Sequence, residues 1–205
     1  SGTYQYSRII TNTTSAYNYA QGVTCDSGGN MYFVGSYKGI ASIKDQAGTS
    51  LGTLPTIGGA SDTGCILCKF DSTGTYQYSR IIDVTTVADS AFGITFDSNT
   101  GNIYITGYYG TGGNALITDA SSIMYGALPQ TLSNATYLIG FDTTGNIVTN
   151  AAGALNYGFY VSGTTNDQTN GVACDSSGNM YMTGFYTSPA TIFSQTAVSL
   201  GTLPT

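Results

Sequence analysis

Short apolar segments separated by small polar residues run along the chain, and one such pattern occurs three times. It reads GVTCDSGGNMYFVG at 22–35, GITFDSNTGNIYITG at 93–107 and GVACDSSGNMYMTG at 171–184. In each copy an apolar stretch ends at Asp, a turn follows, and a second stretch with a central Tyr ends at Gly. Two strands joined by a Gly-containing turn are typical of a β-hairpin. The pattern therefore predicts three equivalent hairpins.

Further segments return at a matching spacing. GTYQYSRII at 2–10 is identical to 74–82, and LGTLPT at 51–56 returns at 200–205, with GALPQ at 126–130 in between. Self-similarity at a fixed period is typical of repeat architectures. We therefore treat 1–205 as one domain with three units, approximately 1–71, 72–142 and 143–205.

Within a unit the pattern predicts four strands, A to D. Strands A and B form the hairpin described above. Strand C covers 64–71 in one unit and 135–142 in the next. Strand D covers 75–82, has an identical copy at 3–10, and has a diverged copy, NIVTN, at 146–150. The segments 37–62 and 108–133 lie between B and C and predict an inserted hairpin. Four strands joined by tight turns form an antiparallel meander.

Strand B is apolar on both faces, since Met31 and Phe33 alternate with Tyr32 and Val34. Both faces must therefore be covered. A tandemly repeated meander that is buried on both faces predicts the blades of a propeller. The expected fold is all-β, with tandem four-stranded antiparallel blades of a β-propeller, about three blades, and inserted hairpins between strands B and C.

The D-S-x-G-N-x-Y-x-T-G core, followed by a strand that ends in K-F-D-S-T-G, resembles the SBBP-type β-propeller repeat, a relative of NHL-like blades. The resemblance extends over all three units. It implies blades of a large secreted, surface-attached or viral protein, and it implies no particular activity. The inserted LGTLPT segment departs from a minimal repeat.

The order of strands leaves both ends unfinished, because the first D strand lacks A to C and the last unit lacks C and D. Three blades are also fewer than the four to eight that usually close a ring. We therefore expect other copies of the chain, or a continuing chain, to associate through open strand edges.

Composition narrows the function classes. Charged residues make up 8% of the chain, there is no His, and the net charge is −6 with only five Lys and Arg. The absence of His excludes Ser-His and Cys-His pairs, and the lack of basic residues argues against nucleic acid as a partner. No apolar run is long enough to span a membrane. We predict a protein without catalytic residues, metal or cofactor; a pair of Asp across a propeller mouth is the remaining enzymatic alternative.

Each predicted turn begins with one carboxylate. We expect these Asp side chains to close the turns by hydrogen bonds. The alternative is a calcium site or an acidic binding face, but calcium loops usually place several oxygen ligands close together. The residues are Asp26, Asp71, Asp97, Asp142 and Asp175.

The four cysteines are expected to be buried structural thiols. Cys25 and Cys174 occupy the position of Phe96, which indicates apolar packing. Cys65 and Cys68 form a C-x-x-C on a predicted strand, where residues three apart point to opposite faces. This spacing disfavours joint metal or redox chemistry.

Tyr37, Tyr108, Tyr109 and Tyr186 follow strand B and could form an exposed aromatic rim for protein or sugar; ordinary packing of the inserted hairpins is the alternative. Asn12 and Asn134 match the N-glycosylation acceptor pattern. The leading hypothesis is a structural or adhesive scaffold, self-associating or fibril-forming, in an extracellular or particle-surface assembly. The alternative is a carbohydrate-binding propeller that uses the Tyr-rich rim and takes glycans as partners.

Overall fold

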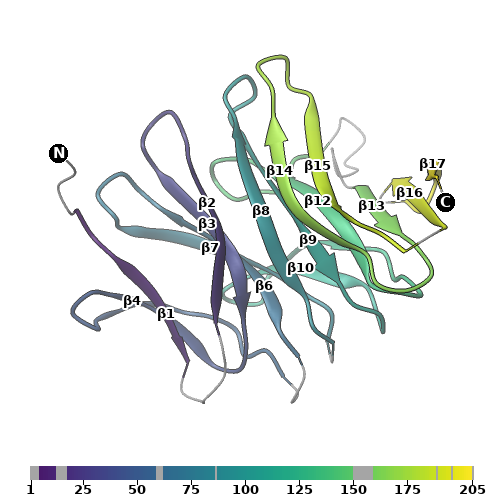
Figure 1. The fold of residues 1–205 in the computed structure, drawn as a ribbon. Coiled ribbons are helices and arrows are strands. Elements are labelled where there is room, and N and C mark those ends of the chain that lie inside the picture. Colours follow the sequence, from purple (N-terminus) through teal and green to yellow (C-terminus); the bar gives the residue numbers. More distant parts are fainter. Residues whose placement is uncertain are drawn as a thin grey trace.

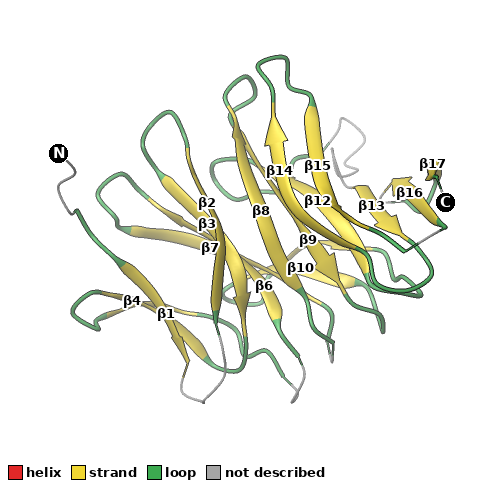
Figure 2. Cartoon of the chain, viewed as in Figure 1, coloured by secondary structure: helices red, strands yellow, loops and turns green. Residues whose placement is uncertain are grey.

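The described residues fold into antiparallel β-sheets (Figure 2). The computed structural model describes residues 5–12, 18–58, 62–85, 87–149, 159–187, 189–194 and 196–204. Within these ranges there is no helix, and so no helix that is long and apolar enough to cross a membrane.

The strands follow one another along the chain, and short turns join the two strands of each hairpin (Figure 1). Their bounds are β1 Arg8–Asn12, β2 Tyr19–Cys25, β3 Met31–Tyr37, β4 Ala41–Asp45, β5 Ser50–Thr53, β6 Gly64–Phe70, β7 Tyr76–Asp83, β8 Ser90–Asp97, β9 Asn102–Tyr109, β10 Ala115–Asp119, β11 Met124–Leu128, β12 Ala135–Phe141, β13 Phe159–Ser162, β14 Gln168–Cys174, β15 Met180–Phe185, β16 Ala190–Ser194 and β17 Ser199–Leu203.

Two complete meanders have the same strand order. In the structure a unit is counted from strand A to strand D, so it includes the D strand that follows the approximate boundaries at 71 and 142. In the first unit β2, β3, β6 and β7 are neighbours, and in the second unit β8, β9, β12 and β13 are neighbours. The registers agree as well, because Met31 of β3 pairs with Phe70 and the equivalent Ile103 of β9 pairs with Phe141. The two units are therefore structural repeats.

The inserted hairpins extend the sheet of the preceding unit. Hairpin β10–β11 of the second unit pairs through β10 with β7 of the first unit, and hairpin β16–β17 pairs through β16 with β13. Hairpin β4–β5 joins β1 in the same way. The two complete sheets consequently have six strands each, and neighbouring units share main-chain hydrogen bonds as well as packed side chains.

The two outer sheets have fewer strands. Strands β1, β4 and β5 form one, and β14 and β15 form the other. In Figure 1 the sheets follow one another like an open fan, with β1 and β4 on one side and β14 to β17 on the other. The described residues do not close a ring.

Strand D of the second meander is interrupted, because no strand forms over 146–149, the described part of the strand predicted at 146–150. Ile147 forms only an isolated bridge with Phe141, and Val148 N–H donates to the carbonyl of Gly140. The strand that pairs with the first half of β12 is β13. The D position thus consists of the isolated bridge at Ile147 and of β13; residues 150–158 lie outside the described residues.

The gaps between sheets contain two hydrophobic clusters. One includes Tyr37, Ile43, Ile66 and Phe70 and lies between the β1–β4–β5 sheet and the first six-stranded sheet. The other includes Val34, Leu67, Ile105 and Tyr137 and lies between the two six-stranded sheets. The two clusters cover both faces of β3. One face of β9 is covered by the second cluster and the other by β14 and β15, where Thr106 contacts Thr169.

The cysteine prediction holds for the C-x-x-C pair and fails for Cys25. Cys65 and Cys68 are buried and belong to different clusters, so their thiols lie on opposite faces of β6. Cys174 lies against the carbonyl of Phe96 in the neighbouring unit. Cys25 occupies the position on β2 that Cys174 occupies on β14. It is exposed because no sheet covers that face of β2 among the described residues.

Candidate functional site

The carboxylates at the ends of strands A and C lie in the turns. Asp26 Oδ1 accepts hydrogen bonds from the backbone N–H groups of Gly28 and Asn30, at 2.9 Å each. Asp175 makes the same pair of bonds to Ser177 and Asn179. The equivalent pattern is present at Asp71 and Asp142, whereas Asp97 accepts from Asn99 N–H and the Thr100 hydroxyl.

These hydrogen bonds stabilise the ionised carboxylates. Side-chain and backbone donors, led by Asn179, lower the pKa of Asp175 to about 2. Burial raises the pKa of Asp26 and of Asp142, but the donors outweigh it and the net direction is downward. Among the described residues, no group of three or more Cys or Asp side chains is arranged to hold a metal ion. The geometry is that of turn closure.

The inserted hairpins use the same turn, which sequence reasoning missed. Asp45 accepts from Ala47 and Thr49 N–H, and Asp119 accepts from Ser121 and Ile123 N–H. The signal was present in the sequence, because both Asp residues follow short alternating stretches and begin the turn-like segments DQAGT and DASSI.

A second recurring side chain anchors the connection from D to A. Asp89 is buried and accepts from Val84 and Gly110 N–H, which joins the end of β7 to the chain after β9. Asp167 occupies the same position before strand A and accepts from Thr187 N–H. In the first unit Asn18 precedes β2 and donates to the Ile10 carbonyl. Sequence reasoning missed this position because the residue alternates between Asn and Asp.

The Tyr residues after strand B are mostly structural. Tyr37 and Tyr109 are fully buried, and their hydroxyls donate to the carbonyls of Pro55 and Pro129. Tyr186 makes the equivalent bond to Pro204 and is 37% exposed. The recurring Leu-Pro of the insertion thus presents a carbonyl to the recurring Tyr.

An exposed aromatic rim is therefore not formed by all four predicted Tyr residues. Tyr37 and Tyr109 are buried, Tyr108 is half-buried and stacks on Phe92 with ring centroids 5.9 Å apart, and only Tyr186 is exposed. Of the four residues predicted for the rim, Tyr186 is the one that is exposed to a sugar or protein partner.

The two N-glycosylation patterns lie in partly buried positions. Asn12 is the last residue of β1, and the two residues that complete its acceptor pattern lie outside the described residues. Asn134 directly precedes β12, and Thr136 of its pattern is buried within that strand. Both Asn side chains are half-buried.

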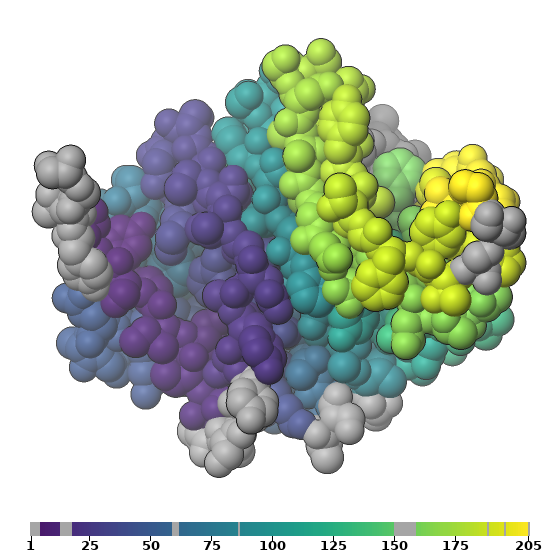
Figure 3. All heavy atoms as spheres, in the orientation of Figure 1, coloured from purple at the N-terminus to yellow at the C-terminus, as the bar shows by residue number. Residues whose placement is uncertain are grey.

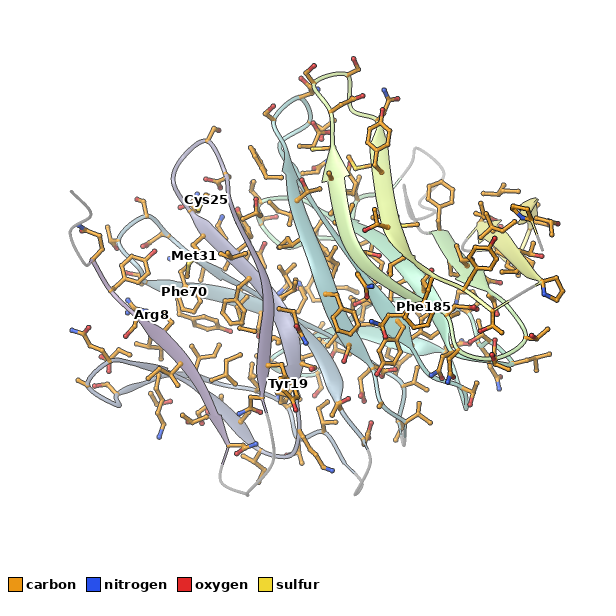
Figure 4. All side chains as sticks on the ribbon, viewed as in Figure 1. Arg8, Tyr19, Cys25, Met31, Phe70 and Phe185 are labelled. Carbon is orange, nitrogen blue, oxygen red and sulfur yellow. The ribbon has the colours of Figure 1, made fainter. Side chains whose placement is uncertain are left out.

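The remaining candidate surfaces are the two outer ends of the stack, which expose apolar side chains. The N-terminal face consists of Ile9, Tyr19, Val23 and Cys25 with half-buried Met31 and Phe33; its groove has a volume of about 460 Å³. Figure 4 shows Tyr19, Cys25 and Met31 on this side and Phe185 on the opposite side.

The C-terminal face is formed by β14 and β15. It consists of Gly171, Tyr181, Thr183 and Phe185, of which Tyr181 is 56% and Phe185 is 52% exposed. In units one and two the residues equivalent to Tyr181 are Tyr32 and Tyr104, both with no exposed surface. Exposure here results from the absence of a covering sheet among the described residues.

Comparison of the chain with known protein families and with curated proteins finds no match to either.

Proposed function

We propose that this chain is a structural or adhesive scaffold that associates end to end with other copies of itself. Its repeat units act as blades of the β-propeller type, with the SBBP-like pattern described above. Such a scaffold would belong to an extracellular or particle-surface assembly and needs no catalytic group, metal or cofactor. The support comes from the way neighbouring units contact one another.

One Gly in strand A marks the contact between successive units. A Cβ at Gly22 would lie 3.0 Å from the Phe92 carbonyl and 3.1 Å from Ile94, both in the next unit. A Cβ at Gly93 would lie 2.8 Å from Val172 N and 2.9 Å from Gly171 Cα, again in the next unit. Strands A of successive units therefore approach each other closely, and a Cβ at either Gly would force its neighbours to shift.

At the C-terminal face the same position is open. A Cβ at Gly171 would meet only the Thr183 hydroxyl, at 3.2 Å. Gly22 lies against Ile94 of the next unit, and Gly93 lies against Val172. In a further copy of the chain, the residue at the position of Ile94 and Val172 is Val23, on the N-terminal face. Val23 is 64% exposed. The single observation that carries the proposal is this match between an open Gly171 and an uncovered Val23.

A contact between different faces of identical chains is heterologous, and it builds a closed ring or an open filament according to the rotation between copies. Apolar side chains supply the driving force, since each Å² of apolar surface removed from water contributes about 25 cal/mol. The low content of charged residues, 8%, leaves little repulsion between the faces.

The test is the mass of the particle in a concentration series by sedimentation. We expect the average mass to rise with concentration, and Val23→Asp to shift that rise to higher concentration. The matched control is Ile123→Asp, which places the same charge at a 60% exposed residue next to β11, away from both faces. A wild-type chain that stays monomeric throughout, or an equal effect of the two variants, would overturn the proposal.

A further inference from the structure

A groove lies beside β15 at the C-terminal end. It has a volume of about 550 Å³, and it is lined by Leu138, Phe159 and Val161 of the second six-stranded sheet and by Met180 and Met182 of β15. In Figure 3 the β14–β15 hairpin is the yellow-green ridge and β16–β17 is the yellow region beside it. The groove is open and predominantly apolar, which suits an extended apolar segment.

The outer edge of β15 borders this groove. Strand β15 pairs with β14 on one edge and with no other strand of the described residues. Its equivalents have both edges paired: β3 pairs with β2 and β6, and β9 pairs with β8 and β12. An unpaired edge presents a row of N–H and C=O groups to a further strand.

The strands that pair with the equivalent edges of β3 and β9 are β6 and β12, and they indicate which kind of segment would bind in the groove. On β6 the side chains of Ile66, Cys68 and Phe70 point back to the preceding sheet, where they are buried. On β12 the corresponding side chains are Tyr137, Ile139 and Phe141, which are also buried against the preceding sheet. Both strands thus carry three large or apolar side chains at alternate positions that end in Phe.

We propose that the groove beside β15 is a strand-acceptor site for an extended segment with the residue pattern of β6 and β12. The segment lies antiparallel to β15, its alternate apolar side chains enter the groove, and its Phe lies opposite Met180. This register copies Met31–Phe70 and Ile103–Phe141. The donated strand adds main-chain hydrogen bonds, and the side chains in the groove give specificity.

This inference rests on the proposed end-to-end association, because the acceptor site lies in the same junction between copies. In the repeat, β7 is separated from β3 by one strand, β6. By equivalence, β1 of the next copy would be separated from β15 by two strand spacings, roughly 10 Å. One inserted strand fills that space and completes the shared sheet.

The test uses the full chain and a fluorescent peptide with the sequence of residues 134–142, NATYLIGFD, and measures binding by anisotropy. We expect saturable binding. Placing Pro at the Ile139 position of the peptide removes an N–H from the ladder, and placing Asp there puts a charge in the groove; each change should weaken binding at least about tenfold. Because these changes are in the peptide, the protein itself stays unaltered.

A matched pair of protein variants locates the site. Met182→Arg places a charge in the groove and should weaken peptide binding at least about tenfold. Met124→Arg, on β11 at a 65% exposed residue outside the groove, should leave binding unchanged. Thermal unfolding of both variants shows whether each has kept the fold.

The outcomes separate this inference from the proposed function. No saturable binding of the peptide, or equal binding of the wild-type, Pro and Asp peptides, overturns the strand-acceptor site whether or not the chain self-associates. Peptide binding by a strictly monomeric chain supports the acceptor site and overturns end-to-end association. Peptide that binds and also raises the sedimenting mass places both at one junction, because the inserted strand completes the sheet that the two copies share.

Discussion

Arg80 Nε donates a 2.6 Å hydrogen bond to the carbonyl oxygen of Gly145, and this bond links strand D of one unit to the C–D turn of the next. The guanidinium carbon lies 4.7 Å from the ring centroid of Tyr78 and 4.1 Å from that of Tyr125. Arg8, in the identical SRII segment, donates through Nε to Gly74 over 2.7 Å. The repeated Arg is thus a contact between units.

Replacing Arg80 should destabilise the fold more than replacing Arg8. Arg80 is 5% exposed, and Arg80→Ala removes charge-assisted hydrogen bonds, two aromatic contacts and packing of its aliphatic stem. We expect a loss of about 2–4 kcal/mol in the free energy of unfolding. Arg8 is only half-buried, so Arg8→Ala should cost less. Urea denaturation of both variants gives the comparison, and equal losses would contradict this account.

The Gly positions of strand A should differ in their tolerance of Ala. Gly93→Ala forces a Cβ against Val172 N and Gly171 Cα, both backbone atoms that side-chain rotation cannot move. We expect a loss of about 1–3 kcal/mol in unfolding free energy. Gly171→Ala meets only a Thr hydroxyl, so the loss should stay within about 0.5 kcal/mol. Thermal or urea unfolding measures both, and a larger loss for Gly171→Ala would refute the ordering.

The stability of the chain should be greatest at mildly acidic pH. Burial raises the pKa of Asp83 to about 6 and that of Asp89 to about 8, and the charge of Asp62 adds to both increases. These folded-state pKa values exceed the ordinary value of 3.8. The two protonated carboxyl groups therefore make their full contribution to the free energy of unfolding below pH 3.8. This contribution decreases as pH rises through about 6 and then about 8.

The turn carboxylates act in the opposite direction. The pKa of Asp175 is lowered to about 2, so its contribution is present above the ordinary value and is lost as pH falls through about 2. Unfolding free energies measured between about pH 2 and 9 should therefore pass through a maximum at about pH 4. Asp83→Asn should reduce the decline between pH 4 and 6. An unfolding free energy that keeps rising to neutral pH would contradict the raised pKa values of Asp83 and Asp89.

Two hairpin turns hold a non-glycine residue in the left-handed region. Ser122 has φ 63° and Ala197 has φ 60°, where the first inserted hairpin has Gly48 at φ 82°. Ser122→Gly should stabilise the chain by about 0.5–1 kcal/mol, because Gly adopts positive φ without steric cost. The neighbouring Ser121→Gly, at negative φ, should give no gain. A thermal shift that is equal for both variants would exclude this explanation.

Much of the strand order follows from alternation and turn chemistry in the sequence. The three DS(x)GN turns and the alternation of Met31 to Val34 predict strands A and B, because a period of two and a closing Asp are local properties. The opposite faces of Cys65 and Cys68 follow from the same period. Packing against the inserted hairpins was the alternative to an exposed rim for Tyr37 and Tyr109, and the tertiary structure decides for packing at both. The choice depends on a Pro carbonyl 18 or 20 residues further along the chain, which accepts from each hydroxyl.

The sequence alone determined the repeat, the four-strand unit and the inserted hairpins, because these depend on neighbouring residues and on identical segments at a constant spacing. Only the tertiary structure decided that each inserted hairpin extends the sheet of the preceding unit, that β13 takes the place predicted for 146–150, and that Cys25 and Val23 are exposed. These features depend on which sheet lies against which. Contacts between sheets arise from long-range packing, which local periodicity does not encode.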